Sequence, residues 1–328
     1  MNSHEDEVGV FVSRAGWSGA DRTPIAGDLS ARRYSRLVNG EGRTAILMEA
    51  GPHEFASTSA FVSIAEWLRN VGLSAPSIFA QEMKKGLLLL EDFGDDKVSI
   101  RISKNAEFLT EFIHKACEAL LVIRSETAPS LPKPTADDLV SATTLVDDWY
   151  PDADTAALDD CRLVLAPLID ELLTETRTVS LRDFHSDNTI WLPARKGPAQ
   201  LGLLDFQDAF VVHPAYDLMS MLTDARTDIP SHMIDQGIEI YAAQSGDDLS
   251  RLRQAVAVLG FQRNLRILGI FARAARRDGK RQHLPAIPRV FRYLDWCVSH
   301  EGLSELRVPF QSALPRTLRA SEFGLRHE

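Results

Sequence analysis

Cysteine, positive charge and long apolar runs are all scarce in this chain of 328 residues. Its three cysteines stand far apart and form no C-x-x-C pair, which argues against a zinc site or a disulfide framework. The net charge of −10 argues against non-specific binding of nucleic acid. We find no apolar run of the about 20 residues that a bilayer span needs, and the acidic N-terminus lacks the pattern of a signal peptide. We therefore expect a soluble, cytoplasmic protein with no membrane or nucleic-acid partner.

The chain does have enough apolar material for a sizeable core, since 45% of it is hydrophobic. At roughly 100–200 residues per domain, its length predicts two domains. Residues 25–29 and 34–38 have the apolar content of strands, and residues 44–49 form a further apolar strand. The segment Asn39-Gly40-Glu41-Gly42, between the strands at 34–38 and 44–49, is a strong signal for a hairpin turn. The N-terminal part therefore predicts a meander of three strands.

Two neighbouring segments, residues 181–188 and 203–208, contain polar residues at a spacing that is typical of a catalytic site. Asp183 is followed five positions later by Asn188, and Asp205 closes an apolar run. Transfer of a phosphoryl group from ATP needs one group to hold the acceptor hydroxyl and take its proton, and two oxygen ligands for Mg²⁺. Asp183 suits the first role, and Asn188 with Asp205 suits the second. The pattern thus predicts ATP and Mg²⁺ as cofactors.

The same residues resemble the catalytic loop of protein kinases, H-R-D-x-x-x-x-N, with its D-F-G metal aspartate. Arg182, Asp183 and Asn188 fall in register, and Asp205-Phe206 stands where D-F would. The chain is similar to the aminoglycoside phosphotransferase branch of the protein-kinase-like superfamily. The resemblance implies an α+β, bilobal fold, with a small N-terminal antiparallel sheet lobe and a larger, mainly helical C-terminal lobe. We expect the nucleotide-binding lobe at residues 1–93 and the catalytic, acceptor-binding lobe at residues 94–328.

The resemblance also implies the nucleotide contacts. In such folds the first hairpin covers the phosphates, here through the backbone of Ser30, Ala31 and Arg32, although an ordinary surface hairpin is the alternative. Residues 86–94 predict a buried strand that leads into a hinge, where the backbone would face the adenine. The contacts implied there are Glu91, Asp92 and Phe93.

The third strand departs from the kinase pattern. Kinases place a phosphate-binding lysine near its end, but here Met48 stands there and no lysine occurs before Lys84. Either the chain keeps the fold without the chemistry, as a catalytically silent nucleotide-binding module, or an arginine supplies the charge. The candidates are Arg32, Arg33, Arg36 and Arg43. We favour an active enzyme, because the base and both metal ligands remain.

The rest of the chain predicts mostly helix, at residues 61–71, 108–124, 137–150, 158–176 and through the last third, with a strand at 75–80. On the acceptor side, His185 would touch substrate or pack the loop, and Gln207 and Asp208 are further acceptor candidates. Asp217 resembles the family's aspartate that braces the catalytic loop, which implies a buried and hydrogen-bonded carboxylate.

Residues 263–280 project several basic side chains, Arg263 among them, onto one helix face. A basic wall of this kind would repel a polycationic aminoglycoside and suit an anionic acceptor, whereas a solvent-facing basic stripe is the alternative. Arg263 is our acceptor candidate on this face.

The amino-acid sequence resembles that of bacterial cell-wall sugar kinases in several segments. These are residues 262–273 and 89–94, Ser30-Ala31-Arg32-Arg33-Tyr34 and Met48. These enzymes phosphorylate the anomeric hydroxyl of N-acetylmuramate and N-acetylglucosamine. The resemblance implies a small-molecule kinase whose acceptor is an amino sugar. Aminoglycosides or other small alcohols, such as choline-like compounds, are the alternative acceptors. The oligomeric state stays open.

Overall fold

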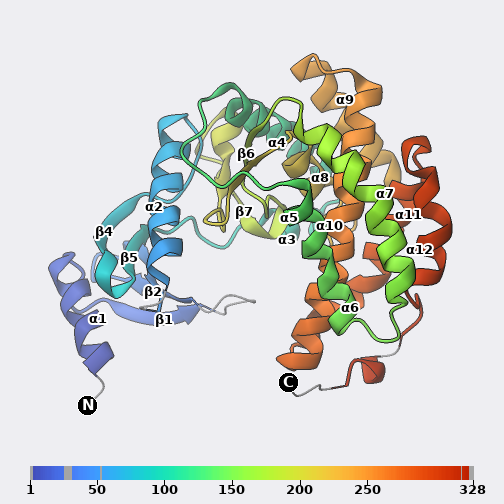
Figure 1. Ribbon diagram of the computed structural model, residues 1–328. Helices are drawn as coiled ribbons and strands as arrows, with labels where there is room; N and C mark the ends of the chain where they lie inside the picture. Colours follow the sequence, from blue (N-terminus) through green and yellow to red (C-terminus); the bar gives the residue numbers. More distant parts are fainter. Residues whose placement is uncertain (1–2, 26–31, 52–53, 319, 325–328) are drawn as a thin grey trace. The chain divides into compact units, whose positions relative to one another are not determined.

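The computed structural model describes residues 3–25, 32–51, 54–318 and 320–324 (Figure 1). The chain divides into two compact units. The first comprises residues 1–97 together with 188–208, and the second comprises residues 98–187 together with 209–328. Residues 188–208, which follow the boundary expected at residue 93, therefore cluster with the N-terminal unit. The functional division into lobes stays a prediction.

The first unit is built on a five-stranded antiparallel sheet in the order β1-β2-β3-β5-β4. Its strands are β1 (Asp21–Ile25), β2 (Arg33–Val38), β3 (Thr44–Glu49), β4 (Ile78–Glu82) and β5 (Leu87–Glu91). The predicted meander is confirmed in β1-β2-β3. The first strand begins earlier than expected, because every residue of β1 is exposed and leaves no apolar alternation to detect. The rest of the predicted strand, at residues 26–29, lies outside the described residues.

The hairpin between β2 and β3 forms at the predicted turn. Asn39 closes it by accepting hydrogen bonds on its side-chain oxygen from the backbone N–H of Glu41 at 3.1 Å and of Arg43 at 2.9 Å. Gly42 has a φ of 76°, a conformation that a residue with a Cβ rarely adopts. The side-chain oxygen of Asn39 and the glycine at position 42 are therefore what this turn requires.

Two helices complete the core of the first unit. Helix α1 (Ser3–Arg14) packs Val8 and Phe11 against residues of β2, β3 and β5. Helix α2 (Phe55–Asn70) buries the apolar face that the sequence predicted, although it begins six residues earlier. The buried residues of that face include Phe61, Ile64, Ala65 and Leu68.

A second, two-stranded sheet in the first unit joins β7 (Thr189–Trp191) to β8 (Leu201–Leu203). It is tied to the segment before β4, because the N–H of Leu203 donates to the carbonyl of Ser74 at 2.7 Å. Across its end, the N–H of Leu204 donates to the carbonyl of Asn188 at 3.0 Å. This ladder places Asn188 and Asp205 at the same end of one short hairpin.

The second unit is mainly helical, with a small antiparallel sheet of β6 (Thr178–Ser180) and β9 (Phe210–Val212). Its helices are α3 (Val98–Lys104), α4 (Phe108–Ser125), α5 (Ala136–Ser141), α6 (Leu145–Trp149), α7 (Thr155–Leu173), α8 (Ala215–Leu222), α9 (Ser231–Ser245), α10 (Leu249–Arg277), α11 (Ile287–Ser299) and α12 (Arg307–Ala313). Together with the antiparallel sheets of the first unit, this confirms the expected α+β fold class.

The helix predicted at residues 137–150 is wrong as a single element, since a 3₁₀ turn at Ala142–Thr144 divides it into α5 and α6. The hydroxyl groups of Ser141, Thr143 and Thr144 each donate to a backbone carbonyl three residues earlier. Such bonds compete with the helical ladder and favour a break.

Helix α10, orange in Figure 1, is the central helix of the second unit. Contrary to the sequence-based expectation, its length and composition would allow a membrane span, but 89% of the relevant window is buried inside the structure. Its close packing depends on Gly269. A Cβ there would lie 2.7 Å from backbone atoms of Leu145 and Val146 in α6.

Candidate active site

Asp217, on helix α8, braces the start of the catalytic segment. Its carboxylate accepts hydrogen bonds from the N–H of Leu181 at 2.6 Å, the N–H of Arg182 at 3.1 Å and the hydroxyl of Ser180 at 2.7 Å. The residue is 2% exposed. Burial raises the pKa of Asp217 to about 6, against the lowering effect of these three hydrogen bonds. The buried carboxylate thus fixes the backbone just before Asp183.

Asp224 is a second buried carboxylate on the same segment, and the sequence analysis missed it. It accepts hydrogen bonds from the N–H of Ser186 at 3.2 Å and the N–H of Arg226 at 2.8 Å, and from the hydroxyl of Ser186. Burial alone would raise the pKa of Asp224, but its interactions with His185, Ser186 and Arg226 outweigh burial and lower it. Its place seven residues after Asp217, two residues beyond the end of α8 at Leu222, was the available signal.

Asp183 itself pairs with Arg263 of α10, whose Nη2 donates to Oδ1 at 3.1 Å. The Asp183 side chain is 36% exposed, so it is reachable by a ligand, whereas that of Arg263 is 4% exposed. Burial alone would raise the pKa of Asp183, but the positive charges of Arg263, Arg266 and Arg182 outweigh burial and lower it. Asp183 is therefore a carboxylate at neutral pH. Arg263 is not part of a solvent-facing stripe, which corrects that alternative at this position.

Two of the candidate segments contain unusual backbone. Among the described residues, three that are not glycine have a positive φ, and these are Asp152, Arg182 at 70° and Asp205 at 60°. Such conformations cost on the order of 1–3 kcal/mol and persist where the surroundings over-determine them. They occur here directly before Asp183 and at Asp205 itself.

The predicted metal ligands lie together in the first unit. The amide of Asn188 donates to Asp205 Oδ2 at 3.3 Å, and the amide of Gln207 donates to Asp205 Oδ1 at 2.8 Å. The next residue, Phe206, is fully buried and stacks on Phe61 with ring centroids 4.9 Å apart. This anchor fixes the chain beside Asp205, whose side chain remains exposed.

The donor set fits Mg²⁺, which prefers oxygen ligands and usually takes one or two carboxylates from the protein and the rest from phosphates and water. No group of three or more His, Cys, Asp or Glu side chains suited to a metal occurs among the described residues. A carboxylate and a carboxamide, as in Asp205 and Asn188, therefore match Mg²⁺ bound with a nucleotide better than a site made by protein ligands alone.

On the nucleotide side, Ser30 and Ala31 lie outside the described residues. Arg32 is 4% exposed, with its Nε 3.4 Å from Glu54 and its Nη2 donating to Ser57. Arg32 and Asp205 both act electrostatically on the buried Tyr34, whose pKa is raised mainly by burial. Among the predicted arginines, Arg32 is thus the one that shares a neighbour with a candidate metal ligand.

The other arginines are committed elsewhere. Arg33 pairs with Glu49, Arg43 pairs with Glu41, and Arg36 pairs with both Asp92 and Asp95. Met48 is fully buried in β3 and offers no charge at the lysine position.

The predicted adenine contacts sit at the end of β5. Glu91 accepts hydrogen bonds from Ser77 and pairs with Arg195, and Asp92 accepts from Arg36 and from the N–H of Gly94. The Arg195 guanidinium lies 5.1 Å from the centroid of the Phe93 ring. The two carboxylate side chains are thus engaged within the protein.

Of the acceptor candidates, His185 is 3% exposed, and its Nε2 lies 3.0 Å from Nη1 of Arg226. Burial lowers the pKa of His185, so the ring is neutral at pH 7. This environment favours packing of the loop over contact with substrate. Gln207 is bonded to Asp205, and Asp208 is exposed.

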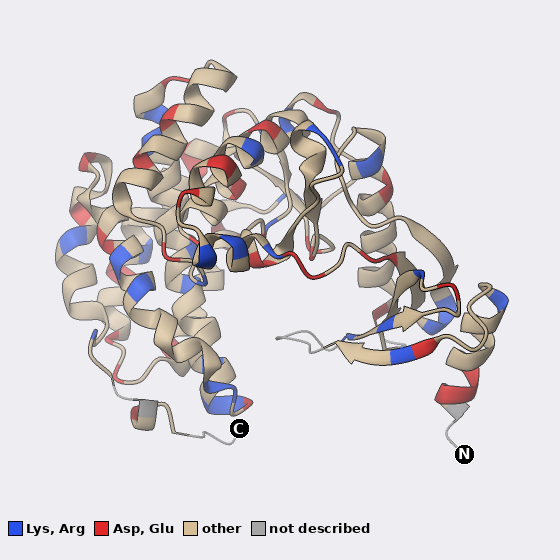
Figure 2. Ribbon diagram, turned by 180° about the vertical axis from the view of Figure 1, so that it is seen from behind, with Lys and Arg blue, Asp and Glu red and all other residues tan. Residues whose placement is uncertain are grey.

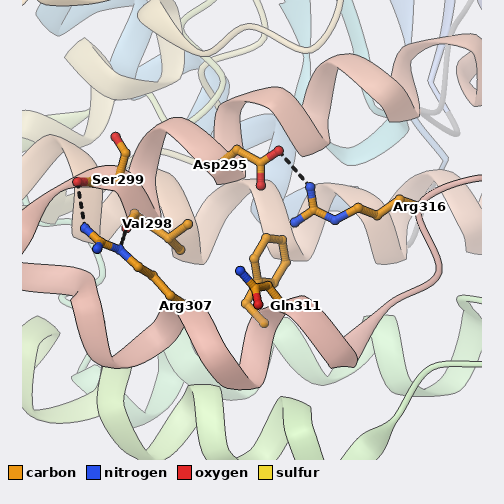
Figure 3. Close-up of a pocket in the computed structure, with 7 residues that line it drawn as sticks. Asp295, Val298, Ser299, Arg307, Gln311 and Arg316 are labelled. Carbon is orange, nitrogen blue, oxygen red and sulfur yellow. Dashed lines mark hydrogen bonds and ion pairs between the residues drawn. The ribbon is translucent and has the colours of Figure 1, made fainter.

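A surface hollow of about 480 Å³ lies elsewhere in the second unit, along α11 and α12. Figure 3 shows Asp295 paired with Arg316, at 2.7 Å, and Arg307 donating to the carbonyls of Val298 and Ser299. None of the candidate residues lines it. Its charged groups are satisfied by the protein, so it offers no free charge to a ligand.

Comparison with known proteins places this geometry in a wider group. The model of the phosphotransferase enzyme family matches residues 21–255. The chain is 33% identical to an N-acetylmuramate/N-acetylglucosamine kinase of Caulobacter vibrioides, with 96% of this chain and 98% of that protein covered. It is 30% identical to a protein of the same name from Pseudomonas aeruginosa, with 90% of each covered.

Solved structures agree on the fold. A choline kinase from Streptococcus pneumoniae matches with a TM-score of 0.64 and 14% identity, over 91% of this chain and all of that one. A choline/ethanolamine kinase family protein from Mesorhizobium loti matches with a TM-score of 0.64 and 12% identity, over 93% of this chain and 98% of that one. At such low identity these structures speak for the fold alone.

Proposed function

The chain belongs to the phosphotransferase enzyme family, and from this premise we propose that it moves the γ-phosphoryl group of ATP to a hydroxyl of an amino sugar, N-acetylmuramate or N-acetylglucosamine. The observation that carries the proposal is the end-to-end match to a curated kinase of that name, at 33% identity over 96% of this chain. Three further relatives carry the same name.

Asp183 is the group that would take the proton of the acceptor hydroxyl. It is ionised at neutral pH, its side chain is partly exposed, and Arg263 fixes one of its two oxygens. A carboxylate of this kind is a suitable acceptor for a sugar hydroxyl. Asp217 and Asp224 position this base through the backbone on either side of it.

Asn188 and Asp205 would hold Mg²⁺ with the nucleotide, since their oxygen atoms lie together at the end of β7 and β8. When bound, the ion would neutralise the charge that develops on the phosphates. Arg32 is our candidate for the phosphate contact made by lysine in kinases, because Arg is always charged. Glu91, Asp92 and Phe93 stay predicted adenine contacts, made through their backbone.

An aminoglycoside acceptor fits the charges less well. The acidic pair Asp147 and Asp148 of α6 is a candidate to bind a cationic acceptor, but Asp147 pairs with Arg162. Arg263 and Arg266 act on the base Asp183 and would repel a polycation. The silent nucleotide-binding module remains the rival from another class, on the strength of Met48. A cytoplasmic location and the absence of nucleic-acid and membrane partners remain predictions.

The test is transfer of labelled phosphate from ATP to a panel of sugars, aminoglycosides and choline, with wild type and Asp183→Asn. We expect transfer to the two amino sugars, and about a 10²- to 10⁴-fold lower kcat in Asp183→Asn, the usual range for a general base. Calorimetric titration with ATP should show Mg²⁺-dependent binding in both proteins.

Each failure has its own meaning. Transfer to an aminoglycoside or choline in place of the amino sugars would remove the proposed acceptor but keep the chemistry. Loss of Mg²⁺-dependent ATP binding, with no transfer to any acceptor, would favour the silent module. Full activity in Asp183→Asn would remove Asp183 as the base.

A further inference from the structure

Arg266 stands one turn after Arg263 on α10 and makes no hydrogen bond or ion pair with any residue that the structure describes. Two other arginines of this helix are engaged: Arg263 pairs with Asp183, and Arg276 donates to the carbonyl of Trp149 at 2.9 Å. Side chains three residues apart on a helix share a face, with their Cβ atoms about 5–6 Å apart. Arg266 is thus a cation beside the base that lacks a partner of its own.

Because of its surroundings, the absence of an anionic partner for Arg266 is unfavourable in free energy. Arg266 is partly buried, and burial is the main cause that lowers its pKa. The positive charges of Arg182 and Arg263 lower it further, against the opposing effects of Tyr216 and Asp183. A desolvated cation without an anion is destabilising, so binding of an anion there would be favourable.

The local charge balance points the same way. Three arginines, Arg182, Arg263 and Arg266, act on Asp183, and Asp183 is already paired with Arg263. The Arg182 guanidinium lies 5.7 Å from the centroid of the Phe210 ring, a contact that leaves its charge unneutralised. Of these three arginines, Arg263 thus has an ion pair with Asp183, and Arg266 lies beside the same carboxylate with no anion of its own in the described chain.

We propose that Arg266 binds a carboxylate on the acceptor and so distinguishes N-acetylmuramate from N-acetylglucosamine. The proposal rests on the proposed function. N-acetylmuramate carries a carboxylate on its lactyl ether, two ring carbons from the anomeric hydroxyl, whereas N-acetylglucosamine carries none. With the hydroxyl at Asp183, this carboxylate is the acceptor's one fixed anion near Arg266. The planar guanidinium suits a two-point bond to it.

The other anion that could meet Arg266 is the transferred phosphoryl group, and kinetics with the two sugars separate these sources. We expect Arg266→Gln to raise KM for N-acetylmuramate about ten- to a hundredfold, the usual effect of losing a charged hydrogen bond. The constants for N-acetylglucosamine should change much less, because that sugar has no carboxylate to lose and feels only the effect of the Arg266 charge on Asp183. Arg266→Lys keeps the charge without the fork and should fall between.

Arg273→Gln is the matched control. Arg273 lies seven residues later on the same face of α10 and likewise makes no hydrogen bond or ion pair in the described chain. Its variant should behave as wild type with both sugars, and thermal melting should show that all three variants fold. Equal losses of kcat with both sugars in Arg266→Gln, or no change with either, would overturn the inference while the proposed function stood. A wild type that phosphorylates neither sugar would overturn both.

Discussion

Asp217 illustrates how a single buried carboxylate can hold the backbone of the candidate catalytic segment. Its two oxygens serve three donors, the N–H groups of Leu181 and Arg182 and the hydroxyl of Ser180. We expect Asp217→Asn to place an amide N–H₂ against one of these donors, at a cost of about 1–3 kcal/mol for the unsatisfied group. The free energy of unfolding should fall by that amount, and kcat should fall more than KM rises, because Asp183 loses its position.

Denaturant unfolding and steady-state kinetics check this prediction. Asp170→Asn is the control, because Asp170 is an exposed residue of α7 with no hydrogen bond in the described chain. It should change neither quantity. If Asp217→Asn kept both the stability and the kcat of wild type, the hydrogen bonds of Asp217 would contribute neither to folding nor to catalysis.

At the residue scale the sequence predicts which side chains are candidates for the chemistry, which stays a prediction, but it does not predict how they are held. The spacing of Asp183, Asn188 and Asp205 is visible in one dimension because all three lie in or beside short turns. The positive φ of Arg182 and Asp205 is not visible, since arginine does not favour it and aspartate, although enriched there, still adopts it uncommonly. Asp224 was missed because its partner, Ser186, lies 38 residues away in the chain.

At the scale of elements, prediction succeeded where one face of an element is buried. The buried residues of α2 follow the helical period, and β3 has the predicted ends. Prediction failed for elements in which buried and exposed residues do not alternate. Strand β1 is wholly exposed, and β9 is a three-residue strand buried throughout, too short for any period. The prediction of helices thus rests on amphipathic faces, and the gaps lie at short elements.

Gly269 allows a test of packing between elements. A Cβ at this position would meet the backbone of Leu145 and Val146 at 2.7 Å, and backbone cannot move aside as a flexible side chain can. We expect Gly269→Ala to separate α6 from α10 and to lower the free energy of unfolding by about 1–3 kcal/mol, the usual cost of overpacking. Denaturant unfolding measures this change.

Gly9→Ala provides the opposite control. Gly9 lies within α1, is exposed, and has nothing within 4 Å of the position of an added Cβ. Alanine there should stabilise the helix by roughly 0.5–1 kcal/mol. Equal effects of the two substitutions would show that the contact of α6 with α10 is looser than described.

At the scale of the whole molecule, the distribution of charged side chains differs from one region to another. Figure 2 shows acidic and basic residues spread along the helices of the second unit. Around Asp183, by contrast, the charges of Arg263, Arg266 and Arg182 all act on one carboxylate. The basic face predicted on α10 runs from the buried Arg263 to the exposed Arg277, so one helix face serves both the base and the solvent. The sequence predicts the basic face of α10, but which end of that face is buried becomes known only from the fold.

Stability of the whole molecule should also depend on pH through buried histidines. His213 is 7% exposed, and its Nδ1 accepts from the N–H of Ala215 at 3.1 Å, so a proton on Nδ1 would break that bond. Burial is the main cause that lowers the pKa of His213, against the opposing effect of Glu175. Because the folded pKa lies below the unfolded one, His213 contributes stability above about pH 6.5 that is lost as the pH falls. Asp217 has the opposite sign: with its pKa raised to about 6, its contribution is lost as the pH rises through that value.

We therefore expect wild type to lose more stability than His213→Gln between pH 7.5 and 5, by up to about 1.4 kcal/mol per pH unit below 6.5, which corresponds to one proton. Glutamine is neutral throughout and can keep an acceptor for Ala215. Denaturant unfolding at several pH values measures the two slopes, and the comparison cancels every other group that titrates in both proteins. Parallel slopes would mean that His213 titrates alike in the folded and unfolded chains. A shallower slope in the variant would assign the acid sensitivity to this buried ring and its bond to the start of α8.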